Sequence, residues 1–321
     1  DAVFHPRAAK DPTVLEQEGW HYELEGDKLT YSGVVYNEMK GAMSAPTSQL
    51  WQNLTSHLFP TTTYHYNSGG EPDHIVDLSY DDLVKFYRHH YHPSNAIFAT
   101  YGNIPAREHH EKFEELALKR FDRLDIELPV KDEKRMFAPV RVEQGYAVNE
   151  GESTDNKTHI VLAWLLGHST DLENQLKADL MTDVLLDNSA APLRKLLETC
   201  GLGSSPSPLC GLEDSNKEMA FMCGLEGSSP RHAAELEQRI LEVLQEVAEN
   251  GVSQARLEAA LHQLELSQRE IGGDHYPYGL QLMMGAISTA MHRGDPIALL
   301  NLDPVLDKMR KEIKQPRFIQ N

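Results

Sequence analysis

Apolar residues recur at helical spacing over most of the second half of this chain. Within residues 230–249, one side of the predicted helix carries Leu236, Ile240, Leu241, Leu244 and Val247, which is the pattern of a helix packed against a core. Gly251 follows this stretch, and glycine often stands just beyond a helix C-terminus. The same reasoning predicts further helices at 172–186, 192–198, 253–270, 276–292 and 296–313.

Shorter apolar runs and alternating patterns lie before and between these helices and predict strands. In the second half they are found at 140–148, 159–165, 204–212 and 219–225. We expect the last two to belong to one meander, because they follow each other closely. Strands and helices mixed in this way indicate an α+β fold.

The first half of the chain repeats this mixture. We expect helices between residues 11 and 58, interrupted at Gly26-Asp27 and at Ala45-Pro46, because such pairs break helices. A further helix is predicted at 78–91, and Ser79 and Asp81 are its candidate N-terminal caps.

Residues 96–101 form an apolar run that predicts a buried strand, and residues 105–121 predict a helix with Pro105 in its first turn. Beyond them the sequence becomes charged and proline-punctuated, without a sustained apolar period. We therefore expect a linker at 126–138 between two domains, 1–125 and 139–321.

Composition and charge narrow the class of protein only slightly. The chain has 321 residues, enough for two cores, and 30 basic against 49 acidic residues give a net charge of −19. This acidity disfavours nucleic acid as a partner and would suit basic peptides. No apolar run approaches the roughly 20 residues of a membrane span. The three cysteines fit no metal spacing, which favours a reducing compartment over a disulfide framework.

The stretch Gly33-Val-Val-Tyr-Asn-Glu-Met-Lys-Gly41 is the most informative chemical feature. Helical spacing places Glu38 on the same face as Val34, Val35 and Met39, so a carboxylate would enter an apolar surface. A buried carboxylate needs a cation, hydrogen-bond donors or a metal. A capped or salt-bridged Glu38, with Lys40 as its partner, is the ordinary alternative to a metal ligand.

Several sequence blocks resemble the pitrilysin/insulinase family of zinc metallopeptidases, in its presequence protease branch. They are the stretch around Glu38, Gln17-Glu-Gly-Trp20 before it, and three blocks after it, Phe59-Pro60, Ser68-Gly-Gly-Glu-Pro72 and Tyr91-His-Pro-Ser-Asn95. Weaker landmarks of the family's second domain are Ala191-Pro-Leu193, Gly201-Leu-Gly203 and Gly294-Asp-Pro296. The resemblance implies two duplicated domains, each a mostly antiparallel sheet packed against several helices.

In that family, zinc is held by the two histidines of an inverted His-x-x-Glu-His motif and by one glutamate on a later helix. Glu38 matches the position of that later glutamate, so the resemblance implies that it is a metal ligand. Neither His-x-x-Glu-His nor His-Glu-x-x-His occurs around any of the sixteen histidines. The cluster Glu108-His109-His110-Glu111 is better explained as a solvated helix start, and Arg88-His-His-Tyr-His92 as a helix C-terminus.

Two explanations fit the missing histidines. Either the chain is a fragment whose first domain is incomplete at its N-terminus and whose second domain is truncated at its C-terminus, or it is a homologue that has lost its metal site. We expect the fragment. No catalytic residue is then present in this chain, and it should be inactive alone, because a catalytic zinc needs three protein ligands.

The resemblance also implies a function for the parent protein. It would be a zinc metalloendopeptidase that degrades short unstructured peptides, basic ones among them, with one zinc ion per full-length protein. Its other partners would be the remaining parts of its own chain, without nucleic acid or a membrane. It would act in the cytoplasm of a bacterium, or in the mitochondrial or plastid matrix of a eukaryote. The alternative is a noncatalytic structural or assembly subunit of the same fold.

Overall fold

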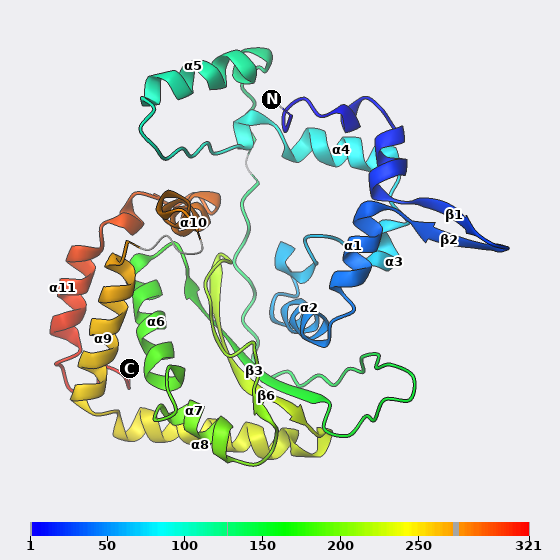
Figure 1. Ribbon diagram of the computed structural model, residues 1–321. Coiled ribbons are helices and arrows are strands. Elements are labelled where there is room, and N and C mark those ends of the chain that lie inside the picture. Colours follow the sequence, from blue (N-terminus) through cyan, green and yellow to red (C-terminus); the bar gives the residue numbers. More distant parts are fainter. Residues whose placement is uncertain (1, 127, 272–275, 321) are drawn as a thin grey trace. The chain divides into compact units, whose positions relative to one another are not determined.

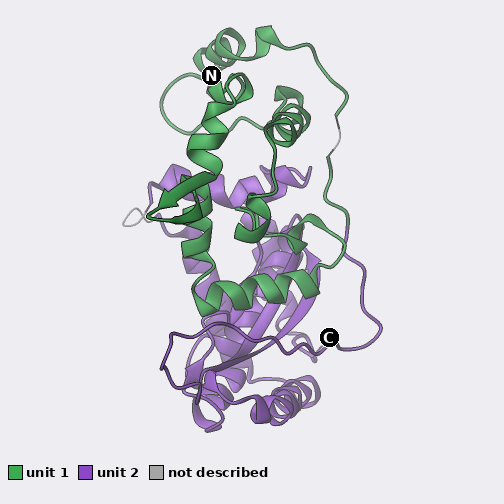
Figure 2. Cartoon of the chain, turned by 90° about the vertical axis from the view of Figure 1, so that its right-hand side faces the viewer, with its two compact units in different colours: residues 1–131 green, residues 132–321 purple. Residues whose placement is uncertain are grey.

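The chain folds into two compact units, residues 1–131 and 132–321 (Figure 2). The computed structural model describes residues 2–126, 128–271 and 276–320. The boundary between the units falls within the expected linker, 126–138. The last part of that linker already belongs to unit 2, where Asp132 pairs with Lys217 at 2.6 Å and Arg135 pairs with Glu218 at 2.8 Å.

Unit 1 contains a two-stranded hairpin and five helices among its described residues (Figure 1). Its elements are β1 (His21–Glu25), β2 (Lys28–Ser32), α1 (Val34–Ala42), α2 (Pro46–Leu58), α3 (Pro72–Ile75), α4 (Tyr80–His90) and α5 (Ala106–Leu116). The predicted helices at 78–91 and 105–121 are present as α4 and α5. Ser79 caps α4 as expected, but its reciprocal partner is Asp82 rather than Asp81.

The expected helix across residues 21–32 is wrong, because this segment is the antiparallel β1–β2 hairpin. Gly26 and Asp27 form a two-residue turn in which Gly26 has φ +62°, a conformation suited to glycine at this place in a hairpin. The Tyr22 and Tyr31 rings face each other across the strands at 5.2 Å. Cross-strand aromatic pairs of this kind stabilise a hairpin.

The expected strands at 96–101 and 140–148 are not formed among the described residues. Both segments lack a paired neighbour, and a strand requires backbone hydrogen bonds to another strand. Their apolar side chains are exposed instead of buried, including Ile97 at 48% and Val140 at 56%. An apolar run therefore does not by itself predict a strand, because it does not show whether another segment pairs with it.

Unit 2 is built on an antiparallel sheet in which β6 is central. Its strands are β3 (Thr158–His168), β4 (Ser205–Pro206), β5 (Gly211–Glu213) and β6 (Glu218–Ser228). On one side β6 pairs with β3, and it also pairs with β4 and β5. The predicted strand 204–212 is thus divided into two short pieces, with Gly211 in a positive-φ conformation at the start of the second.

Six α-helices are described in unit 2, and each overlaps a predicted helix, although the last begins at Leu302 and not at the predicted 296. They are α6 (Leu172–Leu186), α7 (Pro192–Thr199), α8 (Ala233–Asn250), α9 (Gln254–Arg269), α10 (Tyr278–Met291) and α11 (Leu302–Glu312). One buried cluster joins the sheet to α7 and α8 through residues such as Leu193, Leu225 and Leu236. A second cluster joins α6, α9 and α11, which lie side by side in Figure 1.

Candidate functional site

Helix α1, which carries Glu38, is held in place by two closely packed glycines. Gly33 has φ +145°, and a Cβ atom there would lie 2.3 Å from the carbonyl oxygen of Gly19. A Cβ on Gly69 would lie 2.2 Å from the sulfur of Met39. The block containing Gly33 and the block containing Ser68-Gly-Gly70 are therefore packed around the same helix, which explains why both need glycine.

Glu38 itself is exposed on α1, and its neighbours Val34 and Val35 are 57% and 39% exposed. The expectation that this face enters an apolar surface is therefore wrong for the described residues, although Met39 is half-buried. The expected alternative, an ion pair with Lys40, is also not formed. Lys40 instead lies over the ring of Tyr36 at 5.9 Å, and Glu38 makes no ion pair within the described part of the chain.

The histidine clusters are occupied by local contacts. His90 stacks on Phe86 at 4.0 Å and contacts its carbonyl oxygen, while His92 accepts a hydrogen bond from the Ser94 amide. Glu111 pairs with Arg107 on α5. Across residues 2–126, 128–271 and 276–320, no three His, Cys, Asp or Glu residues come together in a way that would hold a metal ion.

These residues do not fit a zinc ion on their own. A catalytic zinc takes three protein ligands and leaves a fourth position for water, whereas Glu38 is a single exposed carboxylate without imidazoles grouped around it in the described structure. We therefore derive no chemical step through zinc for this chain. Glu38 remains a candidate for one ligand of a site completed by other residues.

A second acidic group, not anticipated from the sequence, lies on α6 of unit 2. Burial raises the pKa of Asp179 to about 7, and the nearby carboxylates of Asp214 and Asp183 add to the shift. Gln175 donates a hydrogen bond to Asp214 at 2.7 Å. Asp179, Asp183 and Asp187 recur every four residues between apolar neighbours, and this spacing was the available signal. Among the described residues, these carboxylates form no group of three that could hold a metal ion.

The three cysteines are free, and Cys223 is buried in β6. Burial also raises the pKa of Cys210, which disfavours its thiolate. All three cysteines belong to or pack against the core cluster between the sheet and α7 and α8, as small packing residues.

The model of the peptidase M16 inactive domain matches residues 77–264, which is more than half of the chain. The chain belongs to the peptidase M16 family. The matched segment extends from the end of α3 in unit 1 to α9 in unit 2. It therefore includes the whole unit 2 sheet.

Curated relatives extend the similarity over the entire chain. Protein HypA of Clostridium perfringens is 32% identical over 320 residues, covering 99% of this chain and 33% of the relative. The mitochondrial presequence protease of Xenopus tropicalis is 33% identical over 332 residues, covering 100% of this chain and 32% of the relative. The chloroplastic/mitochondrial presequence protease 1 of Arabidopsis thaliana is also 33% identical, over 98% of this chain and 29% of the relative. This chain thus spans about a third of the length of these relatives.

Solved structures of M16-like proteins share the fold at low identity. A protease from Helicobacter pylori has a TM-score of 0.59 at 16% identity, over 89% of this chain and 66% of that one. An M16 inactive domain from Pseudomonas fluorescens has a TM-score of 0.60 at 15% identity, over 89% of this chain and 64% of that one. The predicted α+β fold with antiparallel sheets is therefore confirmed, as is the resemblance to this peptidase family. Among the described residues, no helix has the length and apolarity needed to span a membrane.

Proposed function

We propose that this chain is an internal part of a zinc metalloendopeptidase that degrades short unstructured peptides. The observation that carries the proposal is similarity over the whole chain to proteins named presequence protease, together with coverage of only about a third of their length. Such coverage leaves most of the full-length machinery outside these 321 residues. The protein would act in an organelle matrix in a eukaryote, or in the cytoplasm of a bacterium.

Within that full-length protein, we assign Glu38 to the zinc site as its carboxylate ligand. Three features support this assignment. Glu38 is exposed and unpaired in the described structure, so its carboxylate is available to a cation. Helix α1 is held by the tight glycine contacts at Gly33 and Gly69, which fix the direction of its side chains. Two neutral imidazoles supplied by residues outside this chain, together with one carboxylate, would leave zinc an open position for water.

The domain division follows the same proposal. Residues 1–125 would be part of the zinc-binding domain, residues 126–138 the linker, and residues 139–321 a second domain of the same fold without a metal. In the part of unit 2 that the structure describes, the buried sheet and helix clusters involve no grouped ligand residues, in keeping with a purely architectural role.

The assignment is tested by Glu38→Gln in the full-length protein. Glutamine keeps the size of the side chain but removes its charge, so zinc affinity should fall by at least about tenfold and peptide cleavage should fall with it. Zinc content after dialysis and cleavage of an unstructured peptide are the two measurements. Glu23→Gln, at an exposed carboxylate on β1, is the matched control and should change neither. Unchanged zinc content in Glu38→Gln would show that Glu38 is not a ligand.

A noncatalytic structural subunit of the same fold is the second candidate. One observation favours it: the family model that matches residues 77–264 is that of the inactive domain. The two candidates differ in the full-length protein, because only the peptidase would retain zinc and cleave peptides.

A further inference from the structure

Residues 136–148, here called the strap, run beside an open edge of the unit 2 sheet. Strand β3 pairs with β6 along one side, and no described strand pairs with its other side. No backbone hydrogen bond joins the strap to β3 within the described structure. The edge of β3 therefore presents unpaired backbone groups, the arrangement that invites pairing with another strand.

Side chains nevertheless join the chain at each end of the strap to β3 or to Lys157, the residue just before β3. Before its start, Arg135 donates a hydrogen bond to the carbonyl oxygen of Leu166 at 2.7 Å. Near its end, the hydroxyl of Tyr146 donates to the carbonyl oxygen of Lys157, and the Tyr146 ring meets His159 edge-on at 6.0 Å. The earlier residue, Arg135, contacts the end of β3, and the later residue, Tyr146, contacts the chain just before β3. The two segments therefore run antiparallel.

The strap is longer than the edge that it follows. From Arg135 to Tyr146 is eleven residues along the chain, whereas from Leu166 back to Lys157 is nine. The two extra residues are taken up near Phe137, where the backbone bends and the side chain is fully exposed. The strap therefore has enough slack to change its register against β3 while its end contacts stay in reach.

The sequence of the strap has the alternation of a strand, although the strap is not paired as a strand in this structure. Its even positions hold Val140, Val142, Tyr146 and Val148, an alternation typical of a strand with one buried face. Val140 and Val142 are 56% and 52% exposed, however. On β3, the even-numbered Leu162 and Trp164 pack in the cluster that contains Leu236 and Ile240 of α8. A paired strap with its valines on this face would extend that cluster.

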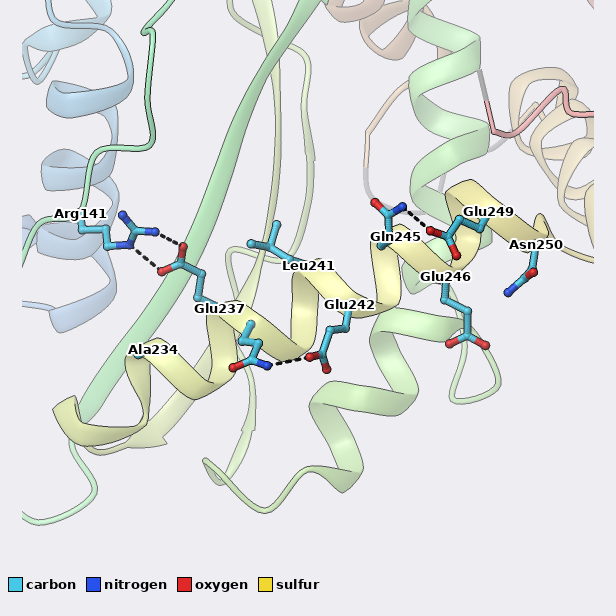
Figure 3. Close-up of a pocket in the computed structure, with 10 residues that line it drawn as sticks. Arg141, Ala234, Glu237, Leu241, Glu242, Gln245, Glu246, Glu249 and Asn250 are labelled. Carbon is cyan, nitrogen blue, oxygen red and sulfur yellow. Dashed lines mark hydrogen bonds and ion pairs between the residues drawn. The ribbon is translucent and has the colours of Figure 1, made fainter.

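One ion pair holds the strap in its present orientation. Figure 3 shows Arg141 directed at Glu237 on α8, with Nε of Arg141 2.8 Å from Oε2 of Glu237 and a second contact from Nη2. This two-point contact turns an odd-numbered side chain of the strap toward α8. Arg141, Glu237 and the 45% exposed Leu241 line the same groove, of about 680 Å³. In a paired strap, Arg141 would point away from α8, and Val142 would turn toward this groove.

The free backbone groups of β3 indicate the register. The amide and carbonyl of Gly224 are used by Cys210 and Ser207, on the side of β6 away from β3. In an antiparallel ladder, alternate residues point to opposite sides. The partners of Leu225 and Cys223, which are Ile160 and Leu162, therefore face β6. It follows that Val161 and Ala163 face the open edge.

We propose that the strap is a latched edge strand, which the Arg141–Glu237 pair holds off β3 and which closes onto β3 when that pair opens. Closure places Tyr146 opposite Thr158, Glu143 opposite Val161 and Arg141 opposite Ala163. The odd residues then exchange backbone hydrogen bonds with β3, and the valines face the cluster at α8. Pro139, which has no amide hydrogen, falls at the end of the new strand, where strands tolerate proline. Closing the strap removes an open sheet edge that could otherwise pair with another chain.

Disulfide trapping tests this register. Cysteines at opposed positions of paired strands lie within the distance that a disulfide spans, so Glu143→Cys with Val161→Cys should cross-link whenever the strap closes. The off-register control is Glu143→Cys with Leu165→Cys. Mass spectrometry of the digested protein separates these links from the native Cys200, Cys210 and Cys223. A link at 165 that forms as fast as the link at 161 would overturn the proposed register.

The latch is tested in the same cysteine background. Arg141→Ala and Glu237→Gln each remove the exposed ion pair, and the rate of cross-linking should rise about two- to fivefold, as expected for losing one exposed ion pair. Arg239→Ala is the matched control, because Arg239 pairs with Glu235 on the same helix and does not touch the strap. In protein without added cysteines, the Val161 and Ala163 amides should exchange more slowly in the two latch variants. A rate and an exchange pattern that do not change in these variants would overturn the proposal.

Discussion

The two units differ in how much of their apolar surface they bury. Among the described residues, unit 1 has three buried apolar residues, Phe59, Ile75 and Ala117, whereas unit 2 has twenty-seven. Unit 1 exposes apolar residues on its hairpin and first helix, including Leu24 at 69% and Val34 at 57%. Because burial of apolar surface is the main stabilising term in folding, unit 2 is stabilised by its own residues, and unit 1 much less so.

The proposed metal ligand and the buried core also lie in different units. The candidate ligand, Glu38, lies in the unit with little core, while the unit with two buried clusters has no grouped metal ligands among its described residues. Full-length relatives are about three times as long as this chain. We infer that unit 1 depends on the remainder of the full-length protein for both its core and its site.

The largest expected effect is on the core of unit 2. Leu236 on α8 is fully buried, so Leu236→Ala should lower the free energy of unfolding of unit 2 by about 3–5 kcal/mol. Leu24→Ala in unit 1 removes the same atoms from a 69% exposed position and should change stability by less than about 0.5 kcal/mol. Chemical denaturation followed by circular dichroism measures both. Equal losses of stability in the two variants would contradict the conclusion that unit 2 has the larger buried core.

The next effect concerns the half-buried carboxyl of Asp179. Its pKa is raised to about 7 in the folded protein, against an ordinary value of 3.8 for aspartate, so the folded state favours the protonated form. The stabilising contribution of that proton is fully present below about pH 4 and is lost as the pH rises through 7. Asp179→Asn should therefore raise the free energy of unfolding by about 2–4 kcal/mol above pH 7, and the gain should vanish toward pH 4.

Unfolding of the Asp179→Asn variant at several pH values tests this prediction, with Asp187→Asn as the exposed control on the same helix. A gain that is the same at every pH would contradict the role of charge burial. The pH dependence also bears on the difference between the two units, because the desolvation cost of a carboxylate arises only where a core surrounds it.

A smaller effect is expected at the glycine contacts of α1. Gly33→Ala places a Cβ 2.3 Å from the Gly19 carbonyl oxygen at φ +145° and should destabilise unit 1 by about 2 kcal/mol. At Gly41, on the same helix, a Cβ meets no atom within 4 Å. Gly41→Ala should therefore stabilise the helix by up to about 1 kcal/mol. Amide exchange in α1 compares the two, and faster exchange in Gly41→Ala than in Gly33→Ala would contradict the packing described for this helix.

Sequence patterns predicted the helices of unit 2 closely. The range 172–186 matches α6 at both ends, because apolar periodicity is local and the side chain of Asp171 caps the first turn. The errors concern strands. Residues 21–32, 96–101 and 140–148 depend on whether another segment pairs with them, and pairing is a property of the whole fold.

The candidate site was also predicted only in part from the sequence. The blocks around Glu38 identified the family correctly, since their glycines and Met39 pack on one helix. The sequence did not reveal that Glu38 is exposed or that Lys40 lies over Tyr36. The role of Glu38 stays a prediction, because a ligand is defined by partners that no described residue of this chain supplies.

The most direct measurement is the zinc content and peptidase activity of the 321-residue chain alone, compared with the full-length protein. We expect that the chain loses zinc on dialysis and does not cleave an unstructured peptide, because Glu38 is one ligand where three are needed. The full-length protein should retain one zinc ion and cleave the peptide. Stoichiometric zinc and zinc-dependent cleavage by the 321-residue chain alone would contradict the account.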